Sequence, residues 1–227
     1  MKYRFLLFDA DDTVFDFAKT AQKCFTETSE LFDMPSKPEN YLLYSEINQK
    51  YWDMYSAGKI GKEEIIPSRF KEYGEITGID FDIRSFAKTY ESKLASTAIL
   101  FTESVEVLSA LHGKGFKIYI ITNGRSTVQR GRLKLSGITD IIDGIFVSDE
   151  MNCAKPSAEY FNKVSSSIPD FDKNSALIIG DSLVSDIPLG INNGVKTCLV
   201  NRSKKVYADS PADYIISDLT ELFNIVI

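Results

Sequence analysis

Short apolar runs that stop abruptly at polar residues recur along the chain. The first run, residues 5–8, is apolar at every position, which is typical of a strand buried on both faces of a sheet. Similar runs lie in the second half of the chain, and the last of them is expected at the edge of the sheet. The expected strands cover residues 5–8, 117–121, 145–147, 176–179, 197–200 and 214–216. Because helix-like segments separate these strands, the pattern predicts an α/β fold with a doubly wound, Rossmann-like parallel sheet.

The stretch 16–96 has a different pattern, without a convincing strand and with apolar residues spaced as on one face of a helix. Three stripes carry this pattern: Phe17, Ala21, Cys24, Phe25, Leu31 and Phe32; Tyr44, Ile47, Tyr51, Trp52 and Tyr55; and Phe86, Tyr90 and Leu94. Since this stretch interrupts the alternation directly after the first strand, we expect an inserted all-helical domain. The predicted boundaries are 1–15 and 97–227 for the sheet domain and 16–96 for the insertion.

Polar residues collect at the expected C-terminal ends of the strands, which is where ligands bind in open α/β sheets. These residues are Asp9, Thr122, Asp149 and Asp181. Asp9 and Asp11 stand at alternate positions, so both can project towards one cavity. Such a pair is a weak indication of catalysis when taken alone, because acidic residues at strand ends also cap helices or face solvent.

Two further segments carry groups that suit a phosphate. Thr122, Asn123 and Gly124 offer a hydroxyl, an amide and free backbone N–H groups ahead of an expected helix, although the same residues would suit an ordinary N-cap and turn. Lys155, which precedes a proline, could neutralise a phosphate oxygen as a point charge. Most Lys-Pro pairs have no such role, so Lys155 indicates a phosphate site only in combination with the polar residues at the other strand ends.

The fourth strand is followed by two more acids, which suit a hard cation. Asp181 is placed to join Asp9 around such an ion, because carboxylate oxygens are its preferred ligands. Asp186 is interpreted either as a supporting residue or as an ordinary helix residue.

Composition removes several other kinds of chemistry. The sole histidine, His112, is expected late in a helix, so a histidine metal cluster is excluded and catalysis would depend on carboxylates. The net charge of −6 argues against a nucleic-acid polymer as partner. The basic cluster of Arg202, Lys204 and Lys205 is interpreted as a solvated loop. An anionic substrate would therefore need positive charge concentrated at its site.

Apolar segments and cysteines indicate the compartment. No apolar run is long enough to cross a bilayer or to form the core of a signal peptide, so we expect no membrane partner and a cytoplasmic protein. Cys24, Cys153 and Cys198 are odd in number and far apart. They are expected to be free packing residues in a reducing compartment.

The four polar segments each follow an expected strand, and their order along the chain resembles that of the motifs of the haloacid dehalogenase superfamily. These segments contain Asp9 and Asp11, Thr122 and Asn123, Lys155, and Asp181 and Asp186. The resemblance covers the sheet domain and implies a magnesium-dependent phosphomonoester hydrolase. It makes Asp9 the nucleophile that becomes an aspartyl phosphate, and Asp11 the general acid and base. It implies phosphate binding by Thr122, Asn123 and Lys155.

The same resemblance implies a Mg²⁺ site. Its ligands would be the carboxylates of Asp9 and Asp181 and the backbone carbonyl of Asp11. Asp186 matches the later acid of the fourth motif, for which a supporting role is expected. The helical insertion corresponds to the cap domain of the superfamily.

Within that superfamily, the first two motifs and the helical cap are most similar to pyrimidine 5'-nucleotidases of the YjjG type. This likeness implies a small phosphorylated metabolite as substrate, namely a nucleoside monophosphate such as UMP, dUMP or dTMP. The aromatic side chains of Tyr51, Trp52 and Tyr55 could stack on a base, but their helical spacing favours a place in the core of the helical bundle. A sugar-phosphate phosphatase or phosphoglucomutase, a 2-haloacid dehalogenase and a non-catalytic phosphometabolite-binding protein remain as alternatives. Asp11 argues against the dehalogenase, which does not need it. Oligomeric state and the natural metabolite are left open.

Overall fold

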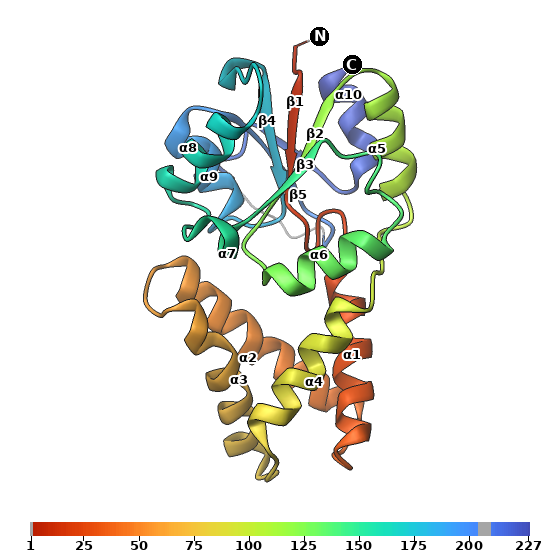
Figure 1. Ribbon diagram of the computed structural model, residues 1–227, viewed down its shortest axis with the longest axis vertical. Helices are drawn as coiled ribbons and strands as arrows, with labels where there is room; N and C mark the ends of the chain where they lie inside the picture. The colour runs from red at the N-terminus through yellow and green to blue at the C-terminus, as the bar shows by residue number, and fades with distance from the viewer. Residues whose placement is uncertain (1, 204–209) are drawn as a thin grey trace. The chain divides into compact units, whose positions relative to one another are not determined.

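The computed structural model describes residues 2–203 and 210–227, and its chain falls into two compact units (Figure 1). One unit comprises Met1–Phe17 and Ile99–Ile227 and contains the sheet, and the other is Ala18–Ala98. Lys204 and Lys205, part of the expected basic loop, lie outside the described residues. None of the helices within the described ranges combines the length and the apolar character needed to span a membrane.

The sheet confirms the predicted α/β class. Within residues 2–203 and 210–227 the sheet has six strands, all parallel, in the order β3-β2-β1-β4-β5-β6. They are β1 (Phe5–Phe8), β2 (Lys117–Thr122), β3 (Gly144–Val147), β4 (Ala176–Gly180), β5 (Lys196–Val200) and β6 (Tyr214–Ile216). The continuous apolar runs explain this arrangement, because a strand such as β1 is buried at every position. As predicted, β6 lies at the edge.

Helices cover both faces of the sheet. They are α5 (Ser104–Gly113), α6 (Ser126–Leu135), α7 (Ser148–Met151), α8 (Ala158–Ser167), α9 (Asp186–Asn193) and α10 (Phe223–Val226), with 3₁₀ turns at Lys173–Ser175 and Leu219–Leu222. In Figure 1, α8 and α9 lie on one side of the strands and α5 and α10 on the other. One core cluster joins Leu7 and Ile178 of the sheet to Tyr160 and Phe161 of α8. The result is the doubly wound architecture in which strand ends remain free to form a site.

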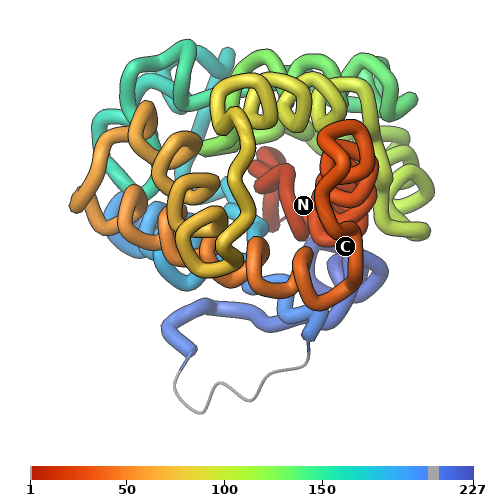
Figure 2. Tube along the Cα trace, turned by 90° about the horizontal axis from the view of Figure 1, so that it is seen from below, coloured from red at the N-terminus to blue at the C-terminus, as the bar shows by residue number. Residues whose placement is uncertain are grey.

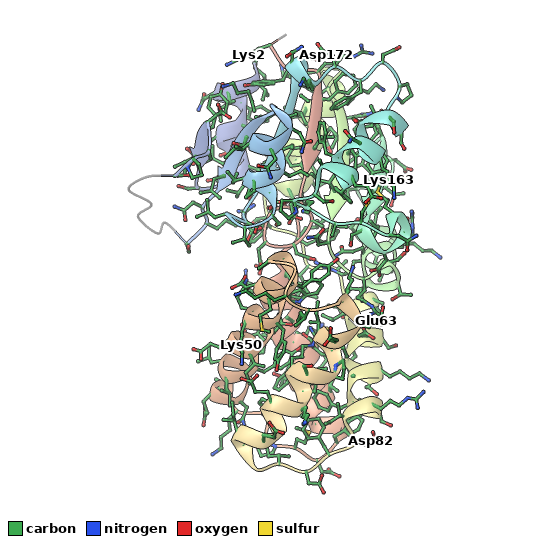
Figure 3. The ribbon with its side chains drawn as sticks, turned by 90° about the vertical axis from the view of Figure 1, so that its left-hand side faces the viewer. Lys2, Lys50, Glu63, Asp82, Lys163 and Asp172 are labelled. Carbon is green, nitrogen blue, oxygen red and sulfur yellow. The ribbon has the colours of Figure 1, made fainter. Side chains whose placement is uncertain are left out.

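The second unit contains four helices, which can be followed from red α1 to yellow α4 in Figure 2. They are α1 (Phe17–Leu31), α2 (Pro38–Ser56), α3 (Lys62–Thr77) and α4 (Ile83–Ala95). Their core is aromatic: Phe25 stacks on Tyr44 at 4.5 Å between ring centroids, and Tyr44 stacks on Phe70 at 5.2 Å. Asp82, labelled in Figure 3, caps α4 by accepting hydrogen bonds from two backbone N–H groups at its start.

Two details of the helical stripes differ from expectation. Leu31 is 64% exposed, because the 3.6-residue period places Thr28 and Ser29 on the inner face of α1 instead. Tyr51, Trp52 and Tyr55 are only half-buried, and the Tyr51 hydroxyl donates to Glu72 at 2.9 Å. The far end of α2 therefore contributes less to the bundle core than its spacing indicated.

A glycine on α9 permits the close packing of this helix on the sheet. A Cβ atom at Gly190 would lie 2.1 Å from Thr197 Cγ2 and 2.9 Å from the Val195 carbonyl oxygen. We expect Gly190→Ala to lower the free energy of unfolding by about 1–3 kcal/mol, because the helix must move away from β5. Urea unfolding measures this loss. Gly113→Ala is the matched control, since a Cβ there meets no atom within 4 Å. Equal effects of the two substitutions would contradict the packing argument.

Candidate active site

Three carboxylates meet at the C-terminal ends of two central strands. Because Phe8 of β1 is in register with Ile179 of β4, Asp9 and Asp181 follow their strands at nearly the same level. Asp186, the first residue of α9, joins them. One carboxylate oxygen from each of these residues lies within 4.8 Å of the others. The structure therefore brings together acids that are far apart in the sequence.

Lys155 supplies the positive charge for this cluster. Its side chain is 1% exposed, and its Nζ atom contacts Asp9, Asp186 at 2.7 Å and the Ile121 carbonyl oxygen at 2.9 Å. Burial lowers the pKa of Lys155, but the charges of Asp186 and Asp9 outweigh burial and raise this pKa overall. A buried ammonium group thus lies beside the predicted nucleophile.

Asp186 is held in place by its neighbours. One of its oxygens accepts from Lys155 and the other from the backbone N–H of Ser182, at 3.1 Å. Gly180 makes room for it, because a Cβ atom at this position would lie 2.3 Å from Asp186 Cγ. These contacts tie Asp186 to Lys155 and to the loop after β4, and its supporting role stays a prediction.

The electrostatics of the carboxylates fit a divalent cation. Burial is the main cause that raises the pKa of Asp9 to about 8; the Lys155 charge opposes this effect, and Asp186 and Asp11 add to it. Burial, followed by the charges of Asp9 and Asp186, also raises the pKa of Asp181 well above its usual range. Buried oxygens that repel one another in this way suit Mg²⁺, which prefers carboxylate ligands. The residues present therefore match the metal that the sequence resemblance implies.

The expected phosphate-binding segment also lies at this edge of the sheet. Thr122 ends β2 and is buried, and its hydroxyl oxygen accepts from the backbone N–H of Gly124 at 3.0 Å. The Asn123 side chain pairs with the backbone of Lys155, donating to its carbonyl oxygen and accepting from its N–H, both at 2.9 Å. This contact aligns the loop that carries Lys155. Phosphate binding by Asn123 stays a prediction.

Asp11 is held by two residues that the sequence did not indicate. Gln129 Nε2 donates to Asp11 Oδ2 at 2.6 Å, and Arg132 forms an ion pair with Asp11 Oδ1. Gln129 and Arg132 lie on α6 three residues apart and so share one face of the helix. That spacing is visible in the sequence, but nothing local connects it with an acid more than a hundred positions earlier.

Two other polar residues have structural contacts. Asp149 accepts from the backbone N–H of Ser126 at the start of α6, at 2.8 Å. Arg202, expected in a solvated loop, is instead half-buried: it pairs with Glu103 at 2.7 Å and donates to the Thr13 carbonyl oxygen at 2.8 Å. The prediction for Arg202 was wrong because its partners come from distant segments. Arg202 supports the loop that follows Asp9 and Asp11.

Known proteins match the chain along most of its length. The family model for haloacid dehalogenase-like hydrolases matches residues 6–200. The HAD-hydrolase YfnB of Bacillus subtilis is 34% identical over 225 residues, covering 99% of this chain and 95% of YfnB. A crystal structure of YfnB bound to magnesium superimposes with a TM-score of 0.93, covering 100% of this chain and 99% of that chain.

Two further relatives have named activities. Pyrimidine 5'-nucleotidase YjjG of Escherichia coli is 30% identical, covering 98% of this chain and 97% of YjjG. Pyrimidine 5'-nucleotidase PynA of Streptococcus pneumoniae is also 30% identical, covering 88% of this chain and 85% of PynA. Both similarities extend over the sheet and the helical insertion.

Proposed function

Because the chain belongs to the haloacid dehalogenase-like hydrolases, we propose that it hydrolyses phosphomonoesters by way of an aspartyl phosphate on Asp9. The observation that carries this proposal is the buried contact of Asp9 with Lys155 beside a second acid, Asp181. A carboxylate in this setting has a cation at hand to offset the approach of an anionic phosphate.

The reaction has two steps. An Asp9 carboxylate oxygen attacks phosphorus, the ester P–O bond breaks, and Asp11 gives its proton to the departing oxygen. Water then attacks the phosphorus of the aspartyl phosphate, Asp11 takes a proton from that water, and the bond to Asp9 breaks. Lys155 and Thr122 bind the phosphoryl oxygens throughout. Both aspartates return to their starting states, as catalysis requires.

Magnesium completes the proposed site. Asp9, Asp181 and the backbone carbonyl of Asp11 would hold the ion, which would neutralise charge on the phosphoryl group. Asp186 would act indirectly by orienting Lys155.

Magnesium is expected to stabilise the protein measurably. At a concentration one hundred times its dissociation constant, it should add about 2.7 kcal/mol to the free energy of unfolding. Chelation with EDTA should remove both this gain and phosphatase activity. The measurement is thermal unfolding with and without MgCl₂.

Asp181→Asn provides the decisive variant for this metal prediction. It removes one expected ligand while keeping the shape of the side chain, so the Mg²⁺-dependent gain in stability should be largely lost. Asp149→Asn is the control, because Asp149 is assigned to the start of α6 and not to the ion. An undiminished gain in Asp181→Asn would contradict the assignment of this ligand.

We further propose nucleoside monophosphates of the pyrimidine series as substrates, supported by the pyrimidine 5'-nucleotidase activity for which YjjG and PynA are named. The test compares kcat/KM for UMP, dUMP and dTMP with the values for sugar phosphates in one assay. Pyrimidine nucleotides should be hydrolysed with the highest kcat/KM. Sugar phosphates that clearly exceed them would contradict the substrate class while leaving the phosphatase proposal intact.

A further inference from the structure

Arg132 is a buried cation with an unusual set of contacts. Its side chain is 0% exposed, and its ion pair with Asp11 is made through Nη1. Nε and Nη2 have no hydrogen-bond partner among the residues that the structure describes. The guanidinium lies instead over two aromatic rings, 4.4 Å from the centroid of Phe15 and 5.4 Å from that of Phe17. Arg132 therefore directs its hydrogen bonding to Asp11 and uses the ring faces to hold its plane.

Gln129 holds the other oxygen of the same carboxylate. Its side chain is buried and passes directly over Gly124. A Cβ atom at Gly124 would lie 2.2 Å from Gln129 Nε2 and 2.8 Å from its Cγ. The glycine of the Thr122-Asn123-Gly124 segment thus leaves the space through which Gln129 reaches Asp11. This close approach is a second observation, independent of the ion pair, that α6 is built around the acid.

The helix that carries both residues is itself anchored. Asp149 accepts from the backbone N–H of Ser126 at its first residue, and Glu150 accepts from Arg130 at 2.6 Å. Arg130 points to the surface, with 53% of its side chain exposed. The helix therefore has a fixed place from which its buried face meets Asp11.

We propose that Gln129 and Arg132 are positioning residues that fix the location and rotation of the Asp11 carboxylate for both proton transfers. One residue binds each carboxylate oxygen, so the group can neither swing about its Cα–Cβ bond nor turn about its Cβ–Cγ bond without losing a contact. The carboxylate remains partly accessible, since the Asp11 side chain is 27% exposed. This inference rests on the proposed function, because it assigns the positioned group the role of acid and base.

Proton transfer is sensitive to the position of the catalytic carboxylate, so loss of a positioning contact should lower the rate. A displacement of about 1 Å in a catalytic group can cost about 100-fold in rate. Substrate binding should change little, because neither Gln129 nor Arg132 is assigned to the phosphate. Loss of either contact should therefore reduce kcat by about 10- to 100-fold and leave KM within about threefold.

The variants for the test are Gln129→Met and Arg132→Lys. Gln129→Met keeps length and volume while removing the donor, and Arg132→Lys keeps the charge while removing the planar group. Arg130→Lys is the matched control, the same substitution two positions away on the same helix, at an exposed side chain where lysine keeps the charge beside Glu150. Its kcat should stay close to that of the wild-type protein. If Arg132→Lys does not fold, Gln129→Met alone decides the outcome.

A double-mutant cycle separates positioning from general damage. Each substitution is also made in Asp11→Asn, and the steady-state rate of phosphate release from p-nitrophenyl phosphate is measured with Mg²⁺, because this rate includes the hydrolysis step that needs Asp11. Action through Asp11 predicts that neither substitution lowers the rate further once the carboxylate is gone. Losses of equal size in both backgrounds, or an unchanged kcat in the wild-type background, would overturn the inference. A wild-type protein without phosphatase activity would instead overturn the proposed function.

Discussion

Asp9→Asn is expected to lower the rate of phosphate release by about 10⁴-fold or more, a scale typical of removing a nucleophile. The amide that replaces the carboxylate has no oxygen able to form the phosphoryl bond at a useful rate. The substitution also removes one of the expected Mg²⁺ ligands. Both effects act on the same step, so their separate losses will not add.

The fold should tolerate this substitution. Lys155 keeps its buried pair with Asp186 at 2.7 Å, so its ammonium group is not left without a partner. Asp181 loses a negative neighbour whose charge raises its pKa. The temperature of unfolding without Mg²⁺ should therefore not fall, which distinguishes lost chemistry from lost structure.

The measurement is steady-state phosphate release, with Asp12→Asn as the control. Asp12 belongs to the same acidic loop and has a φ of 57°, a conformation that asparagine also adopts readily. The activity of the Asp12→Asn variant should remain within about tenfold of the wild-type value. Comparable losses in the two variants would mean that charge in the loop, and not a nucleophile at Asp9, supports turnover.

Asp11→Asn is expected to lower turnover of a nucleoside monophosphate by about 10²- to 10⁴-fold, the usual contribution of general acid–base catalysis. An alkoxide leaving group needs a proton, and the water of the second step needs a base. An asparagine can supply neither. The loss should therefore appear in kcat with little change in KM.

An activated ester separates the two steps. p-Nitrophenolate leaves without a proton, so Asp11→Asn should still be phosphorylated by p-nitrophenyl phosphate. Its hydrolysis without a base should be slow, which predicts a burst of about one p-nitrophenol per enzyme before a slow steady state. Rapid-mixing absorbance measures this burst. Equal rates for both phases would contradict a role for Asp11 in the hydrolysis step.

The strands could be predicted from the sequence for a local reason. A central strand of a parallel sheet is buried on both faces, so its apolar run is continuous and needs no knowledge of its neighbours. The predicted strand 5–8 and β1 (Phe5–Phe8) coincide for this reason, and β2 extends only one residue beyond its predicted end. The doubly wound order then places the strand ends, and with them the acids, at one edge.

The errors and omissions concern side chains whose partners are distant in the sequence. Arg202 is charged and lies in a basic segment, yet it packs 3.4 Å from the centroid of the Phe101 ring and pairs with Glu103. Arg132 is likewise a charged residue of the kind expected on the surface of a helix, but its side chain is fully buried and pairs with Asp11. The local sequence pattern predicts that an arginine is exposed to solvent, and only the tertiary contacts show that these two are not.

The candidate site could be predicted in part: its chemical groups are visible in the sequence, but their hydrogen-bond partners are not. The motifs name Asp9, Lys155 and Asp181, and the structure brings them together at the predicted edge of the sheet. They do not reveal that the Asn123 amide is engaged with the backbone of Lys155. Sequence indicates which chemical groups are present, whereas hydrogen-bond partners decide which of them are free to meet a substrate.

The covalent role of Asp9 is tested most directly by peptide mapping. Asp11→Asn is mixed with p-nitrophenyl phosphate and Mg²⁺, quenched in acid during the slow phase, digested and analysed by mass spectrometry. We expect one phosphoryl group on the peptide that contains Asp9, and none when Asp9→Asn is combined with Asp11→Asn. Burst release of p-nitrophenol without that modification, or with a phosphoryl group on another residue, would contradict a covalent role for Asp9.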